Sequence, residues 1–335
     1  MSAAAAEGAI YLGSYLAPLA GLLAREDVTD LYVNRPGEVW TESLNGAIER
    51  HDVPDLTETV LTRLSRQIAA LSHQGVSREH PLLAAALPGG ARVQVVAPPA
   101  TRGPLALAIR KHVSSDLSLA DYVTSGAFDE TSRGDGAARA ATDARLTALL
   151  AADDIAGLLA TAVRARRNIL VSGGTSTGKT TFLNALLREI PAEERLILIE
   201  DTPELIIHHE NSIGLVAARG QLGEARVTAD DLLAASLRMR PDRIILGELR
   251  GAEALTFLRA VNTGHPGSMT TIHADGAERA IEQIALLVMQ AGTRLGRDDI
   301  QHYVRGTIDV FVHLDRSGGR RRVAEVMLRE QLSGV

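Results

Sequence analysis

Hydrophobic and polar positions follow different patterns in the two parts of the chain. In the first part, short apolar runs bounded by turn sequences predict β-strands. These runs are residues 30–34, 39–40, 92–96 and 105–110. Apolar residues at helical spacing over residues 57–71 predict a helix among the strands. Strands and helices that are mixed without regular alternation indicate an N-terminal α+β domain, which we place at residues 1–113.

From residue 137 onward, helical runs alternate with short strands rich in β-branched residues. The predicted strands are residues 168–172, 196–200, 243–247 and 268–273. Helices between successive strands require crossover connections, which predicts an α/β domain with a mainly parallel sheet over residues 137–335. Residues 114–136 lose this periodicity, and their polar stretch 129–136 predicts a flexible linker.

The apolar segment Gly8–Ala24 does not have the pattern of a membrane span. It is uncharged, but Pro18, three glycines and a serine interrupt it, and it falls short of the roughly 20 apolar residues that cross a bilayer. We expect a buried amphipathic helix, with contact at a membrane surface as the alternative. The first residues also lack the basic and apolar regions of a secretory signal, so we expect a cytoplasmic protein.

Composition narrows the function classes further. The 335-residue chain has a net charge of −6 and contains only five Tyr, four Phe and one Trp. A broad nucleic-acid surface needs positive charge and aromatic stacking platforms, so direct nucleic-acid binding is not expected. We interpret the basic runs 164–167 and 320–322 as solvated faces. The absence of cysteine excludes disulfides, thiolate zinc sites and cysteine nucleophiles.

The stretch GGTSTGKTT has the spacing of a phosphate-binding loop and lies between a predicted strand and a predicted helix. Backbone amides and the start of the helix would bind phosphate, Lys179 would bridge the β- and γ-phosphates, and the Thr180 hydroxyl would ligate Mg²⁺. The sequence therefore predicts ATP and Mg²⁺ as ligands. The predicted nucleotide-binding residues are Gly173, Gly174, Thr175, Ser176, Thr177, Gly178, Lys179, Thr180 and Thr181.

Acidic residues stand at the ends of two predicted strands, and a histidine stands at the end of a third. Glu200 and Asp201 close one strand, Glu248 closes the next, and His273 follows the last. Parallel strands bring their carboxyl ends to one edge of a sheet, so we expect these side chains beside the phosphate loop. Hydrolysis requires one carboxylate that orients water and another that holds the metal's water shell.

We interpret residues 206–210, IIHHE, as a further strand.

Four segments taken together resemble a known superfamily. GGTSTGKTT, LILIEDTPEL, SLRMRPDRIILGELRGAEAL and NTGHPGSMTTIHAD occur in the order of the phosphate loop, acidic box, Walker B segment and histidine box of the secretion ATPases. Within that superfamily the chain most resembles the hexameric traffic ATPases of type IV secretion systems. The resemblance implies a RecA-like C-terminal domain with a phosphate loop and a mainly parallel sheet, joined to an N-terminal α+β domain.

The resemblance also implies residue roles. Glu248 corresponds to the carboxylate that polarises the attacking water, His273 to the histidine-box residue, and Lys179 and Thr180 to the phosphate and magnesium residues. The acidic box, Glu200 and Asp201, would lie at the magnesium shell.

In the N-terminal domain, Arg92 and Arg110 would reach the nucleotide between domains or subunits. A guanidinium suits this role because it keeps its charge and presents a fork of hydrogen-bond donors to phosphate oxygens. Arg102 lies between these two in the sequence without a clear counterpart.

The function implied is an ATP-driven motor. Hydrolysis in a homohexameric ring would move the N-terminal domains and power substrate transport, conjugation or pilus biogenesis. Expected partners are inner-membrane secretion-complex proteins and coupling ATPases, with the chain at the cytoplasmic face of the inner membrane. A tight-adherence or other pilus assembly ATPase remains the alternative, followed by a nucleic-acid translocating motor. A small-molecule kinase lacks a recognisable acceptor pocket and a use for the N-terminal arginines.

Overall fold

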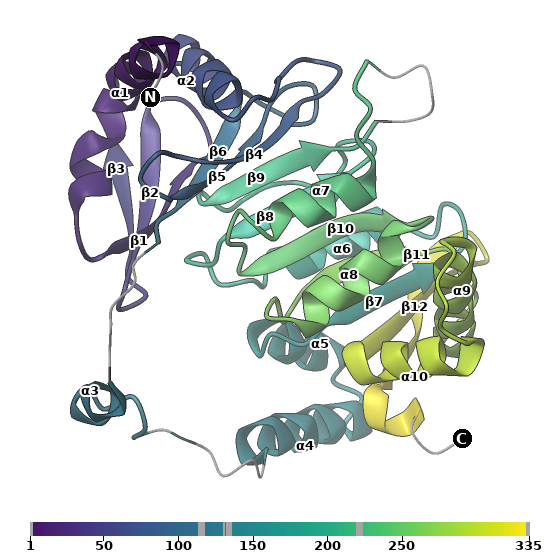
Figure 1. The fold of residues 1–335 in the computed structure, drawn as a ribbon. Coiled ribbons are helices and arrows are strands. Elements are labelled where there is room, and N and C mark those ends of the chain that lie inside the picture. Colours follow the sequence, from purple (N-terminus) through teal and green to yellow (C-terminus); the bar gives the residue numbers. More distant parts are fainter. Residues whose placement is uncertain (1–2, 113–117, 130, 132–135, 219–223, 333–335) are drawn as a thin grey trace.

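The structure is a computed structural model that describes residues 3–112, 118–129, 131, 136–218 and 224–332 (Figure 1). Two β-sheets, one from each part of the chain, organise these residues. The remaining residues, which include 114–117, 130 and 132–135 of the predicted linker, lie outside this description. The predicted α/β class with a parallel C-terminal sheet and a separate α+β part is confirmed.

The N-terminal sheet is antiparallel, with the strand order β3-β2-β1-β6-β5-β4. Helices α1 (Ala3–Ala24) and α2 (Glu58–Leu71) pack on it, and Leu19, Leu64 and Leu107 share its core. No helix among the described residues is long and apolar enough to cross a membrane. The strands are β1 (Val28–Val33), β2 (Glu38–Ser43), β3 (Ile48–Asp52), β4 (Leu82–Ala86), β5 (Arg92–Val96) and β6 (Ala106–Arg110).

The C-terminal sheet has the order β13-β12-β7-β11-β10-β8-β9, and all of its pairs are parallel except β12 with β13. Its strands are β7 (Ile169–Gly173), β8 (Leu196–Glu200), β9 (Ser212–Val216), β10 (Arg243–Leu249), β11 (Met269–Ile272), β12 (Val310–Ser317) and β13 (Arg320–Leu328). Its helices are α4 (Ala137–Ala151), α5 (Ile155–Arg164), α6 (Lys179–Leu187), α7 (Ala229–Ser236), α8 (Glu253–Asn262), α9 (Ala277–Gln290), α10 (Arg297–Thr307) and the 3-10 turn η1 (Arg329–Leu332).

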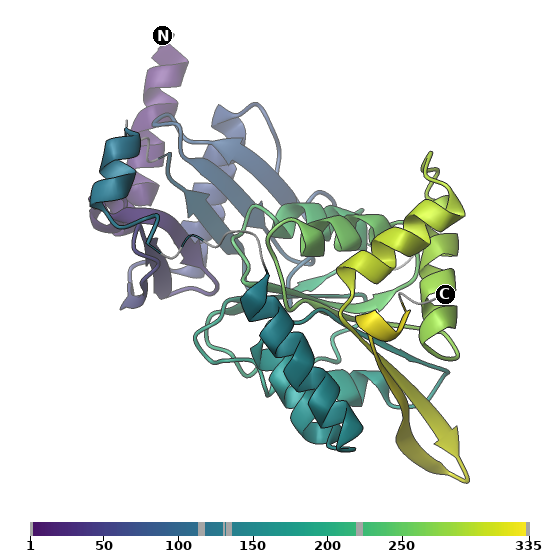
Figure 2. The same ribbon diagram turned by 90° about the horizontal axis from the view of Figure 1, so that it is seen from below.

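Both faces of this sheet are covered by helices, with α4 to α6 on one face and α7 to α10 on the other (Figure 2). Strand β8 shows how the sequence supports this. Ile197 and Ile199 belong to the core on the α7 side, whereas Leu196 and Leu198 belong to the core on the α4 side. Alternate strand residues point to opposite faces, so an uninterrupted apolar run is the pattern of a strand buried on both faces.

All predicted strands except the one at residues 206–210 are confirmed, whereas β3, β4, β9, β12 and β13 were not predicted. The interpretation of residues 206–210 as a strand is wrong, because they form an irregular segment. There His209 is buried with its Nε2 3.1 Å from the Pro191 carbonyl oxygen, while His208 is exposed. The helix α3 (Leu119–Thr124) lies in the connection between the two parts, and none of its residues is buried (Figure 1).

The N-terminal part covers the edge of the C-terminal sheet. Thr101 forms an isolated antiparallel bridge with Leu215 of β9, and the Arg102 amide donates to the Gly214 carbonyl at 2.9 Å. Gly214 leaves room for the Arg102 side chain, because a Cβ there would lie 2.5 Å from Arg102 Cδ. The contact also pairs an edge strand that would otherwise expose free backbone groups.

A fully buried arginine holds the two parts together at a second place. The Arg195 guanidinium lies 4.1 Å from the ring centroid of Tyr32 and donates to Asn34 Oδ1 at 2.8 Å and to the Met239 carbonyl at 3.0 Å. It also donates to Asn211 Oδ1. Burial lowers the pKa of Arg195 to about 10. The charge is tolerated because hydrogen bonds and an aromatic face replace its hydration.

Replacing Arg195 with Ala should therefore destabilise the protein by about 2–4 kcal/mol, since buried hydrogen-bond acceptors lose a charged donor and a cavity opens. Chemical denaturation followed by circular dichroism measures this change. Arg164→Ala is the control, because Arg164 forms an exposed ion pair with Glu189, and the variant should lose less than about 1 kcal/mol. Equal losses in the two variants would contradict the role assigned to Arg195.

Candidate functional site

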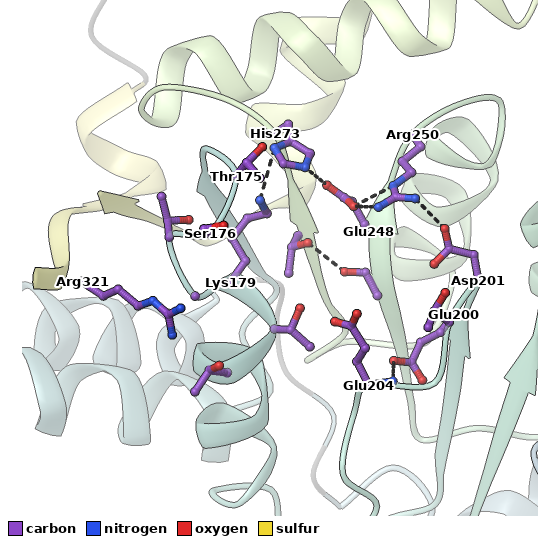
Figure 3. Close-up of a pocket in the computed structure, with 17 residues that line it drawn as sticks. Thr175, Ser176, Lys179, Glu200, Asp201, Glu204, Glu248, Arg250, His273 and Arg321 are labelled. Atoms are coloured by element: carbon purple, nitrogen blue, oxygen red, sulfur yellow. Dashed lines mark hydrogen bonds and ion pairs between the residues drawn. The ribbon is translucent and has the colours of Figure 1, made fainter. Parts of the chain in front are cut away.

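A pocket opens where the carboxyl ends of β7, β8, β10 and β11 meet the start of α6 (Figure 3). Its volume is about 320 Å³, within the roughly 300–1,000 Å³ range of small-molecule sites. The sequence placed acidic residues and a histidine at these strand ends, and the parallel sheet gathers them. The pocket is lined by Thr175, Ser176, Thr177, Gly178, Lys179, Thr180, Thr181, Glu200, Asp201, Thr202, Glu204, Gly247, Glu248, Arg250, Thr271, His273 and Arg321.

The phosphate loop is a tight turn from β7 into α6. Ser176 and Gly178 have φ values of 62° and 95°, and the Thr177 hydroxyl donates to the Gly174 carbonyl at 2.9 Å. Gly173, at the base of the loop, has no room for a side chain, because a Cβ would lie 2.6 Å from Thr177 Oγ1. Lys179 begins α6, so the free amides of the first helical turn face the pocket. The amides of the loop and of the first turn of α6 can therefore bind an anion.

Lys179 is buried beside the loop. Its Nζ donates to the carbonyls of Gly173 at 2.9 Å and Gly174 at 3.1 Å, and it lies 3.3 Å from His273 Nδ1. Burial lowers the pKa of this ammonium group. The contacts hold the positive charge at the mouth of the loop, where it can meet the terminal phosphates of a nucleotide.

Glu248 connects the histidine to an arginine that the sequence analysis did not single out. Glu248 Oε1 lies 2.9 Å from His273 Nε2, and Oε2 accepts from Arg250 Nε at 2.6 Å. Arg250 Nη1 also donates to Asp201 Oδ2 at 2.6 Å. The ends of β10, β11 and β8 are thus joined by one chain of polar contacts from Lys179 to Asp201 (Figure 3). Arg250 stands within the quoted Walker B segment, so its position in that motif was the available signal.

The two acidic-box residues have different surroundings. Glu200 is buried, and its Oε1 accepts from the amides of Glu204 at 2.9 Å and Leu205 at 2.8 Å. Its Oε2 is ion-paired with Arg102, whose Nη1 donates to the Leu205 carbonyl at 2.7 Å. Burial lowers the pKa of Arg102. Glu200 therefore anchors the backbone that follows β8, whereas the partly exposed Asp201 presents its carboxylate to the pocket.

Arg92 and Arg110 lie directly opposite each other on β5 and β6 and are both exposed. They line one pocket with Leu237 and Arg238, and another whose lining includes Lys111 and His112. Neither arginine lines the phosphate-loop pocket of its own chain. The structure therefore brings the two together but does not bring them to the loop.

Two basic runs interpreted as solvated faces need correction. Arg167 is buried and forms an ion pair with Asp143 at 2.6 Å, so its run is partly structural. Arg321, in the other run, lines the phosphate-loop pocket. In both cases the contacts are distant in sequence, and local composition could not reveal them.

Comparisons with known proteins agree with this geometry. A profile of the type II/IV secretion system protein family matches residues 139–330. The type IV secretion system protein VirB11 of Bartonella henselae is 37% identical over 324 residues, covering 93% of this chain and 91% of the relative. The VirB11 of Brucella suis is 38% identical over 332 residues, covering 96% and 91%. The crystal structure of the Brucella suis VirB11 ATPase in complex with sulphate superposes with a TM-score of 0.91 at 36% identity, covering 98% of each chain.

Glu248→Gln should retain nucleotide binding and lose turnover by about 100-fold or more, because an amide cannot accept a proton from the attacking water. Phosphate release and the binding of a fluorescent ATP analogue measure the two effects separately. Glu204→Gln changes an exposed acid of the same pocket and is the matched control, with near-normal turnover expected. If Glu248→Gln instead fails to bind nucleotide, Glu248 is needed for binding and its assignment as the base is wrong.

Proposed function

Because the chain belongs to the VirB11 ATPases of type IV secretion systems, within the type II/IV secretion family, we propose that it works as a homohexameric ring. ATP hydrolysis would move the N-terminal domains of this ring to power substrate transport or pilus biogenesis. The observation that carries the proposal is the position of Arg92 and Arg110, together on the N-terminal domain but outside the phosphate-loop pocket of their own chain. The domain division into residues 1–113, 114–136 and 137–335 is part of this proposal.

The roles of the pocket residues follow from their contacts. The amides of the loop and Lys179 bind the phosphates, and Glu248 accepts the proton of the attacking water. His273 lies between Lys179 Nζ and Glu248 Oε1, where it would form a hydrogen bond with the terminal phosphate. Arg250 holds one oxygen of Glu248, which leaves the other directed toward His273.

Mg²⁺ fits the residues present. The described residues include no group of three or more metal-binding side chains, which argues against an all-protein cage. Magnesium in phosphate-loop sites takes few protein ligands and completes its shell with phosphates and water. Thr180 supplies the hydroxyl. Asp201 fits the surrounding water shell better than Glu200, because its carboxylate is partly exposed at the pocket beside Arg250, whereas Glu200 is buried with its oxygens engaged by Arg102 and backbone amides. Bound Mg²⁺ would neutralise charge on the phosphates.

The arginine pair supports a site shared between subunits. Like charges directly opposite on neighbouring strands destabilise a sheet, and Lys111 and His112 add further basic groups beside them. Asp30 Oδ1, 3.9 Å from Arg110 Nε, offsets part of this repulsion, and an anion between the two arginines would offset more of it. Since they lie away from their own loop, the anion they fit is the nucleotide held by the neighbouring chain of a ring.

The proposed function also implies partner proteins. Its partners would be inner-membrane secretion-complex proteins and coupling ATPases, and these would recruit it to the cytoplasmic face of the inner membrane. Direct nucleic-acid binding is not part of the proposal, because the net charge is −6. We place VirB11-type secretion above pilus assembly because the VirB11 relatives are matched over nearly their whole length.

With Mg²⁺ and a non-hydrolysable ATP analogue, light scattering should give a particle of about 214 kDa, since six chains of 35.6 kDa form a closed ring. The parent chain without nucleotide provides the comparison. A monomer or dimer that binds the analogue would contradict the proposed ring and would still support the phosphate loop as the nucleotide site.

Mixing two inactive variants tests whether the arginines act between subunits. Arg92→Ala/Arg110→Ala keeps an intact loop and Glu248, whereas Glu248→Gln keeps intact arginines. Each alone should lose about 100-fold or more in turnover. In an equimolar mixture, random assembly should restore activity at about one interface in four.

The control mixture combines Glu248→Gln with Lys179→Ala. Both changes affect the same pocket, but each leaves the arginines intact, so neither chain supplies a working site and activity should stay low. Recovery in the first mixture but not in the control supports a shared site. No recovery in either mixture would place the arginines at their own chain's nucleotide or outside the reaction.

A further inference from the structure

Arg321 approaches the phosphate loop from the side opposite to the acidic residues. It belongs to β13, near the turn of the β12–β13 hairpin, where it pairs in register with Arg316. Strand β12 flanks β7 on one side, and β11 and β10 flank it on the other. The loop that follows β7 therefore lies between Arg321 and the pair formed by Glu248 and His273 (Figure 3).

The side chain of Arg321 lies directly against the loop backbone. A Cβ placed on Gly178 would lie 3.2 Å from Arg321 Cδ and 3.9 Å from its Nη1. Gly178 has a φ of 95° and immediately precedes Lys179, at the start of α6. The guanidinium is thus close to the amides that bind phosphate in this loop type.

The charge of Arg321 has no protein counterion within the described part of the chain. The next residue, Arg322, forms a two-point ion pair with Asp315 at 2.8 Å. No such acid faces Arg321, although it lines a pocket that contains four carboxylates, all from β8, β10 and the segment after β8. An exposed cation that is held beside an anion-binding loop and lacks a carboxylate partner fits a phosphate group.

We propose that Arg321 binds the α- or β-phosphate of the nucleotide. The terminal phosphate of ATP faces Glu248, where water must attack, so the opposite side of the loop receives the phosphates that ATP and ADP share. Arg321 therefore contributes equally to binding both nucleotides and little to the chemical step. This inference rests on the phosphate loop as the nucleotide site and not on the proposed ring.

The test compares nucleotide affinities in Arg321→Gln. The dissociation constants of a fluorescent ADP and of a fluorescent non-hydrolysable ATP analogue should both rise about tenfold, the effect of one lost charge-assisted hydrogen bond. The ratio between them should not change, and kcat at saturating ATP should stay within about a factor of two, because the contact exists before and after hydrolysis. Arg321→Lys should recover part of the affinity, because it keeps the charge but not the planar fork.

Arg320→Gln is the matched control, since Arg320 is the neighbouring exposed residue of the same hairpin and does not line the pocket. It should bind both nucleotides as the parent does. Unchanged ADP affinity in Arg321→Gln overturns the proposal, as does a loss confined to the ATP analogue. Lys179→Ala tests the premise separately: if it binds ADP as tightly as the parent does, the loop is not the nucleotide site.

Discussion

The buried ion pair between Arg102 and Glu200 is the interaction on which the site depends. Glu200 ends β8, and Arg102 comes from the loop before β6 that pairs with the edge of the other sheet. Because a buried carboxylate needs a partner, the N-terminal domain in this position stabilises the acidic box. The other Glu200 oxygen fixes the amides of Glu204 and Leu205, and so shapes the wall of the pocket that begins at Asp201.

This connection gives domain movement a defined consequence. Breaking a buried pair by removing one partner costs about 3–5 kcal/mol, so the N-terminal domain cannot leave β9 without exposing or re-pairing Glu200. The same displacement would uncover Arg195, which is buried against Tyr32 and Asn34 of that domain. The acidic box and the domain contact therefore depend on each other, and in the proposed motor a swing of the N-terminal domain would change the charge beside the nucleotide.

Sequence alone predicted the parts of the structure that depend on local pattern. The loop, Glu248 and His273 follow directly on strong apolar strands, and parallel pairing is enough to bring them together. Strand β4, LLAAA, was missed because alanine has low strand propensity, and β3 because its exposed edge is mostly polar. Arg102 was seen but not placed, since its partner Glu200 is distant in sequence and belongs to the other domain.

The order of strands around β7 brings different side chains to the two sides of the phosphate loop. On one side, β11 and β10 bring His273 and Glu248, groups that accept protons and suit the end of the nucleotide where water attacks. On the other side, the β12–β13 hairpin brings Arg321, which keeps its charge and suits phosphates that are not cleaved. With the roles proposed above, a loop flanked in this way would separate nucleotide binding from hydrolysis, because a second cation beside Glu248 would compete with the attacking water for its oxygens. Arg250 already occupies one of them, so a further cation on the hairpin side would contact phosphate without engaging the other Glu248 oxygen.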